Sequence, residues 1–186
     1  QTVILWQLTN QQQLGQVYAS TSLGIDAFRI DGDGTFLYAN ATNRLAAVRD
    51  GATQNMTSSY PGNYSSAAFG RLGGRDVLAL GGRDGAVEFA DLETATLLDV
   101  NIQAAQMAIL SLAISPDGKY MVTSHCGDQQ PNEFCSESVI QIWDMQTKEV
   151  VRLPIEHADS VTSLAFSSDG ARLASGSRDG TVILWD

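Results

Sequence analysis

The sequence predicts an all-β protein built from repeated antiparallel units, and three observations lead to this fold class. Short apolar and polar runs alternate along the chain, and no apolar pattern has the length of a helix. Asp-Gly pairs, which favour tight β-hairpins, stand between these runs, as at Asp117 and Asp169. The same order of runs and turns then returns at a nearly fixed spacing. A chain of 186 residues is long enough for one domain with a substantial core.

The repeated unit is recognised by the residue pair that closes it. These pairs are Trp6-Gln7, Arg49-Asp50, Ala90-Asp91, Trp143-Asp144 and Trp185-Asp186. Successive pairs lie 43, 41, 53 and 42 residues apart, so one interval carries an insertion of about ten residues. Residues 2–6 and 181–185 are the same five amino acids at the same point of the unit. We therefore divide the chain into residues 1–20, which end one unit, and the units 21–59, 60–101, 102–154 and 155–186.

The last unit resembles a WD40 repeat. From His157 to Asp186 it alternates short apolar strands with Asp-Gly turns and ends in the Trp-Asp pair that gives the family its name. The resemblance implies a β-propeller of four-stranded antiparallel blades, with about four WD40 repeats in this chain. Because a propeller protects its strand edges by closing, we expect an arc of a larger ring, the seven-bladed ring typical of the family. The alternative is a four-bladed ring in which residues 16–20 complete the blade of residues 181–185.

On the family's template, each closing pair ends the third strand of a blade. The two Asp-Gly turns join residues 109–114 to 120–123 and residues 161–166 to 172–175 as the first and second strands of their blades. We expect third strands at residues 2–7, 45–49, 86–90, 140–143 and 181–185, and outer strands near residues 16–20, 97–100 and 149–153. Residues 51–59 are polar and turn-like, so we predict no outer strand there.

Three side chains of the last unit are the residue types of a hydrolase triad, but the resemblance assigns them a structural role. His157, Ser175, Asp179 and Trp185 match the family's buried hydrogen-bonded tetrad, except that Glu156 stands where a glycine is usual. A serine committed to an indole and an imidazole inside a sheet faces no oxyanion hole. We therefore expect these residues to fix the blade, with Ser177 as the alternative serine, and we expect no catalytic residue.

Cofactors, metals, nucleic acids and membranes are not expected as partners. His125, Cys126 and Cys135 lack the fourth ligand of a zinc site, and the Asp-Gly pairs at residues 31–34 read as a turn rather than a calcium loop. A net charge of −10 and a pI near 4.4 disfavour binding to phosphates and to anionic lipid. The longest apolar stretch, residues 107–114, is far too short to cross a bilayer.

The two cysteines bracket the insertion in the 53-residue interval. Cys126 and Cys135 stand near the points where this loop leaves and rejoins the blade, so a disulfide between them is geometrically feasible. Two free thiols would instead fit a cytoplasmic protein, which is the localisation we expect, because most WD40 proteins work inside cells. A bridge would indicate an extracytoplasmic, oxidising compartment.

The function we predict is a non-enzymatic platform for protein or peptide partners, belonging to a larger protein. Recognition is expected on the loops at one rim, because loops on a rigid scaffold are where binding residues usually lie. The candidate contact residues, which include arginines and tyrosines of the kind favoured at interfaces, are Tyr60, Tyr64, Arg83, Phe134 and Arg178. The alternative is a ligand-binding or hydrolytic propeller whose site lies in the central channel.

Overall fold

The computed structural model describes most of the chain and shows only strands, turns and bends in it. The described residues are 2–7, 12–18, 25–30, 36–41, 45–50, 55–127, 137–151 and 157–186. No helix occurs among them, and so they include none that could cross a membrane. The predicted all-β class is confirmed.

The strands form five antiparallel sheets in which neighbours in the sequence are neighbours in space. The first sheet pairs β1 (Thr2–Gln7) with β2 (Gln12–Tyr18). The second contains β3 (Ala27–Ile30), β4 (Phe36–Ala41), β5 (Leu45–Asp50) and β6 (Met56–Pro61). The third contains β7 (Tyr64–Leu72), β8 (Arg75–Gly82), β9 (Ala86–Asp91) and β10 (Thr96–Gln103). The fourth contains β11 (Ile109–Ile114), β12 (Tyr120–Cys126), β13 (Ser138–Asp144) and β14 (Val150–Val151). The fifth contains β15 (Val161–Phe166), β16 (Leu173–Ser177) and β17 (Val182–Trp185).

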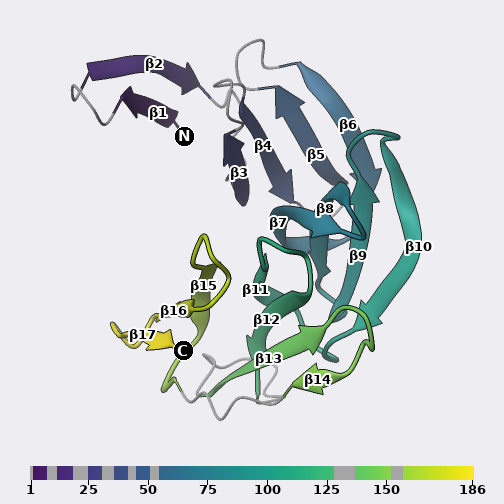
Figure 1. Cartoon of the computed structure of the whole chain (residues 1–186), viewed down its shortest axis with the longest axis vertical. Helices are drawn as coiled ribbons and strands as arrows, with labels where there is room; N and C mark the ends of the chain where they lie inside the picture. The colour runs from purple at the N-terminus through teal and green to yellow at the C-terminus, as the bar shows by residue number, and fades with distance from the viewer. Residues whose placement is uncertain are drawn as a thin grey trace.

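The second to fifth sheets follow one another around a common centre as blades of a β-propeller. Figure 1 shows the first strand of each of these sheets, β3, β7, β11 and β15, nearest the centre, with β6, β10 and β14 on the outside. β2 pairs with β1 along its length, and β17 has one neighbour, β16, among the described strands. Among the described residues, β2 does not lie beside β17 as the four-bladed closure would require, and the size of a complete ring stays a prediction.

The Asp-Gly pairs fold into the predicted hairpin turns by a shared set of hydrogen bonds. Between β11 and β12 the Ser115 hydroxyl donates to Asp117 Oδ1 at 2.7 Å, and between β15 and β16 Ser167 donates to Asp169 Oδ1 at 2.5 Å. The glycines that follow, Gly118 and Gly170, have φ of 72° and 71°, a left-handed conformation that glycine adopts without steric cost. The serine three residues before each glycine and the aspartate just before it therefore specify the turn locally.

The aspartates of the closing pairs organise the turns to the outer strands. Asp91 Oδ1 accepts the backbone N–H groups of Glu93 and Thr94, both at 2.9 Å. Asp144 Oδ1 accepts the corresponding groups of Gln146 and Thr147, at 2.8 and 3.0 Å. Because these bonds favour the carboxylate, they hold the pKa of both aspartates below the usual range. The aspartate is thus conserved in role between the two blades, although Ala90 replaces the tryptophan before Asp91.

The hydrophobic core lies between the sheets rather than within any one of them. Three separate clusters of buried apolar side chains join the second sheet to the third, the third to the fourth and the fourth to the fifth. Their largest fully buried members include Phe89, Leu78, Leu80, Ile109 and Met121. Leu78 and Leu112 are buried in these clusters, while Phe28, Leu37 and Phe69 are partly exposed.

Two sequence predictions about the second sheet are wrong. An outer strand, β6, does occur within the region where none was predicted, and it runs on to Pro61. Its residues are mostly polar because one face of an outer strand meets solvent. A strand with so few apolar residues shows a weak apolar–polar alternation, and its sequence therefore resembles that of a turn. Tyr60 belongs to β6 and is 1% exposed, so it is not a loop residue.

Close approach between the third and fourth sheets depends on glycine at Gly70 and Gly81. A Cβ atom added to Gly70 would lie 2.7 Å from Cβ of Ile114 on the next blade. One added to Gly81 would meet the Ser66 hydroxyl and lie 2.8 Å from Cβ of Ile109. Both separations are shorter than side chains tolerate, so β7, β8 and β11 can pack at this distance only without those side chains.

We predict that Gly70→Ala lowers the free energy of unfolding by about 1–3 kcal/mol, because β11 has to shift to admit the methyl group. The matched control is Gly176→Ala, whose added Cβ would lie 3.8 Å from its nearest neighbour. We expect this control to change stability by less than about 0.5 kcal/mol. Urea unfolding of both variants tests the prediction, and equal effects would contradict it.

Candidate functional site

The last blade brings four polar side chains from separate elements into one chain of hydrogen bonds. Trp185 Nε1 donates to Ser175 Oγ at 3.1 Å, and Ser175 Oγ lies 2.8 Å from His157 Nε2. His157 Nδ1 lies 3.2 Å from Asp179 Oδ2. The indole has only a donor and the carboxylate only acceptors, so the serine donates to Nε2 and the proton of the imidazole sits on Nδ1. Every polar group in the chain is satisfied.

Thr181 joins this arrangement, although the sequence did not single it out. Its hydroxyl donates to Asp179 Oδ1 at 2.6 Å and lies 3.0 Å from His157 Nδ1, so the imidazole proton is shared between Thr181 and Asp179. The signal was available, since a threonine two residues after an aspartate commonly caps such a turn. The Thr181 hydroxyl, and then the N–H groups of Thr181 and Ala158, hold the pKa of Asp179 well below its usual range.

The serine and the histidine of this hydrogen-bonded set are too deeply buried for a substrate to reach them. Ser175 is 0% exposed and His157 is 3% exposed. Ser177, the alternative serine, takes a different place, because its hydroxyl donates to the carbonyl of Asp159 and accepts the N–H of Asp179. A nucleophilic serine has to face a cleft in which a carbonyl can be attacked, and Ser175 does not. The geometry is one that fixes His157, at the start of the blade, to β16 and β17.

The preceding blade has a partial version of the same arrangement. Trp143 Nε1 donates to Thr123 Oγ1 at 3.2 Å, but Ala105 stands where the histidine would be. On the same face of β12 and β13, two buried atoms, Nε2 of His125 and Oε1 of Gln141, have no hydrogen-bond partner. The buried polar groups of this blade are therefore less completely hydrogen-bonded than those of the last blade.

Tyr64 supplies a different polar link in the blade before that. Its hydroxyl donates to Glu88 Oε2 at 2.6 Å, and the Tyr64 side chain belongs to the core between the second and third sheets. Burial first, and then the bond to Glu88 and the charge of that carboxylate, raise the pKa of Tyr64. The phenol thus remains a donor at any physiological pH.

Tyr60 and Tyr64 are corrections to the predicted contact surface. The sequence suggested an exposed loop here, but the two residues lie in β6 and β7 and are 1% and 3% exposed. Their rings fill the space between two sheets, where alanines on the facing strands leave room for them. Neither side chain can contact a partner.

Arg83 and Arg178 are exposed and occupy equivalent positions on one rim. The N–H of Arg83 donates to the carbonyl of Asn63 at 3.0 Å, and the N–H of Arg178 donates to that of Ser160 at 2.9 Å. Each bond ties the turn between a second and a third strand to the start of the blade's first strand. We call the rim that carries these turns the b–c face. Two arginine side chains are thus held on rigid turns with their charged groups in solvent.

Cys126 ends β12 on this same face. It is disulfide-bonded, and the N–H of Gly127 donates to the carbonyl of Glu137 at 2.9 Å, which closes the base of the inserted loop. Cys135, the other cysteine of the chain, and Phe134 lie outside the described residues. The pairing with Cys135 and the contact role of Phe134 stay predictions.

The inner strands enclose a hollow of about 430 Å³ at the centre of the arc. Serine and threonine side chains and apolar residues of β3, β7, β11 and β15, among them Phe28, Phe69 and Leu112, line it. Among the described residues of this lining, Asp26 is the one ionisable side chain. Within the part of the chain that the structure describes, no three His, Cys, Asp or Glu side chains are arranged to hold a metal ion.

Comparison with known proteins agrees with this architecture. The sequence family described as "WD domain, G-beta repeat" matches residues 100–144 and 148–186, which contain the closing tryptophans Trp143 and Trp185. The protein groucho of Drosophila melanogaster is 34% identical over 111 residues, which cover 59% of this chain and 14% of groucho. The match therefore spans only a small part of that relative.

We predict that His157→Ala costs about 1–3 kcal/mol of stability, because it leaves Ser175 and Asp179 without a buried partner. Trp185→Phe keeps the ring but removes the indole donor and should cost less. Arg178→Ala, a change on the exposed rim of the same blade, is the control and should have an effect below about 0.5 kcal/mol. Thermal unfolding measures all three. A His157→Ala protein that melts like the wild type while losing a hydrolytic activity would contradict the structural role.

We predict that a disulfide joins Cys126 to Cys135. Replacing both by serine should lower stability by about 2–3 kcal/mol, because the unfolded chain regains the freedom of a short closed loop. Counting thiols on the unreduced, denatured protein from its native host checks the pairing, and two reactive thiols would exclude it.

Proposed function

The chain belongs to the WD40-repeat family, and from this premise we propose that it is a non-enzymatic scaffold that holds protein or peptide partners as part of a larger protein. The observation that carries the proposal is the hydrogen-bonded set of His157, Ser175 and Asp179. These residues suit catalysis by type, but they are bonded to one another and to Trp185, and Ser175 and His157 are buried.

The central hollow supports the same conclusion. General acid–base chemistry needs two groups of different protonation, or one group and a metal, within reach of a substrate. The described lining offers the single carboxylate of Asp26 among hydroxyls and apolar groups. The alternative, a ligand-binding or hydrolytic propeller with its site in this channel, would require further groups from other parts of a complete protein.

We place the partner-binding surface on the b–c face. Arg83 and Arg178 repeat there at the same position of two blades, and each is exposed on a turn that a backbone hydrogen bond fixes. A rigid turn binds at a lower entropic cost than a flexible one, and arginine is favoured at the centres of interfaces. Two guanidinium groups on an acidic protein would suit a partner that presents carboxylates toward this rim.

The redox state of Cys126 bears on the compartment in which the protein works. Stable disulfides form mainly outside the cytoplasm. The disulfide at Cys126 therefore supports the extracytoplasmic alternative over the cytoplasmic localisation, and the thiol count described above decides between them.

We predict that removing both guanidinium groups, with Arg83→Ala and Arg178→Ala together, weakens partner binding at least about tenfold, because truncating a central arginine commonly costs more than 1 kcal/mol. Partners captured from the native host by the full chain are identified, purified and titrated against the variant by calorimetry. Arg172→Ala, which changes another exposed arginine whose guanidinium pairs with Asp186 on the opposite rim, is the control and should change the affinity less than about twofold. Capture of no protein, together with turnover of a small molecule by the purified chain, would contradict the scaffold function.

A further inference from the structure

We propose that the opposite mouth of the channel binds a protein segment in which an acidic side chain adjoins an apolar one. This mouth lies where β3, β7 and β11 end, at the rim away from Arg83 and Arg178. A hollow of about 510 Å³ opens there. It is lined by two arginines, Arg29 and Arg71, and by apolar residues that include Phe28, Ile30, Phe69 and Pro116.

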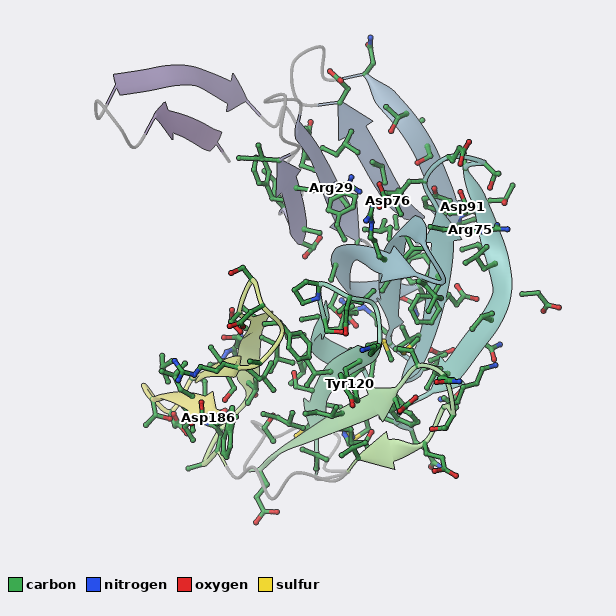
Figure 2. All side chains as sticks on the ribbon, viewed as in Figure 1. Arg29, Arg75, Asp76, Asp91, Tyr120 and Asp186 are labelled. Atoms are coloured by element: carbon green, nitrogen blue, oxygen red, sulfur yellow. The ribbon has the colours of Figure 1, made fainter. Side chains whose placement is uncertain are left out.

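The two arginines come from neighbouring blades and share one carboxylate. Arg29 Nη2 donates to Asp76 Oδ2 at 2.8 Å, and Arg71 Nε donates to Asp76 Oδ1 at 2.9 Å. Figure 2 shows Arg29 beside Asp76 near the inner strands. The bond from Arg71, followed by that from Arg29, lowers the pKa of Asp76, so the carboxylate stays ionised and keeps both guanidinium groups in place. The cluster has a net charge of +1 in a protein whose net charge is −10.

Arg71 has binding capacity beyond its bond to Asp76. A guanidinium carries five N–H donors, and the bond to Asp76 uses the one on Nε. The Arg71 side chain is 63% exposed at the edge of the hollow. A second carboxylate can therefore bind its outer edge while Asp76 holds the inner one, and two acceptors around one guanidinium are a common arrangement in proteins.

The apolar part of the hollow faces solvent and would gain from being covered. Ile30 is 56% exposed, and Phe28 and Phe69 are partly exposed. Gly70 lets β11 approach β7 closely enough for Ile114 to form the floor beside them. An apolar side chain placed here removes these surfaces from water, while the neighbouring arginine fixes its orientation.

The charge of the whole protein decides which kind of ligand fits. A nucleic acid or an anionic membrane brings many phosphates, which a protein with a net charge of −10 repels. A peptide segment brings one or two carboxylates together with the apolar group that the rest of the lining requires. The inference rests on the proposed scaffold function in that it takes the ligand to be a protein segment.

The test uses the full chain labelled with ¹⁵N and two blocked hexapeptides. One peptide carries two leucines followed by two glutamates, and the other carries glutamines in place of the glutamates. We expect the glutamate peptide to shift the amide signals of residues 28–30, 69–71, 114 and 115 in a saturable way. The glutamine peptide should bind at least about fivefold more weakly, because it lacks the charge-assisted bond.

Two variants of matched exposure separate a specific contact from general charge. Arg71→Gln should weaken binding of the glutamate peptide at least about fivefold. Arg75→Gln removes the same charge from an arginine that is 64% exposed and pairs with Asp91 outside the hollow, and it should have an effect below about twofold. Equal weakening by both variants, equal affinity for both peptides, shifts confined to other residues, or no binding at millimolar peptide would each overturn the proposal. Arg71 lies away from the b–c face, so this test and the test with Arg83 and Arg178 can fail independently.

Discussion

Face-to-face packing between neighbouring sheets is the interaction on which the rest of the structure depends. Each of the three buried clusters takes its side chains from two successive sheets, so a single sheet has no core of its own. Where the facing strands carry alanine, as around Tyr60 and Tyr64, a large ring fills the space, and where they carry bulky aliphatic residues a glycine such as Gly70 provides room. The position of each blade is therefore set by its neighbours, and the inner strands are held around the centre as a consequence.

Polar contacts then decide how firmly each blade is fixed. In the last blade, His157 joins the entry to the blade to its second and third strands through a chain of bonds with no unsatisfied atom. The preceding blade retains only the bond between Trp143 and Thr123, and it also contains the unpaired buried atoms of His125 and Gln141. Since unsatisfied buried polar atoms lower stability, that blade is held mainly by its apolar faces. The blades of one chain thus reach similar shapes by different balances of polar and apolar contacts.

The two ends of the channel differ in chemistry because different parts of the repeat end there. At the b–c face, the turns present Arg83 and Arg178 singly, one on each blade. At the opposite mouth, Arg29 and Arg71 from successive blades converge on Asp76 beside exposed apolar residues. The two ends therefore differ in the charged and apolar groups that they expose.

The sequence by itself determined the features that depend on local chemistry. Turn geometry follows from short-range hydrogen bonds, such as those of Asp117 and Asp169, and the period of the units follows from the alternation of strands and turns. The all-β class, most strand positions and the residues of the last blade's polar set could therefore be predicted. Only the tertiary structure decided what depends on neighbours: that β6 is a strand, that Tyr60 and Tyr64 are buried, and that Arg29 meets Asp76, which lies 47 residues further along the chain. The physical reason is that a polar outer strand gains its hydrogen bonds from β5, and a tyrosine its burial from the next sheet. Neither partner is visible in the local pattern of the sequence.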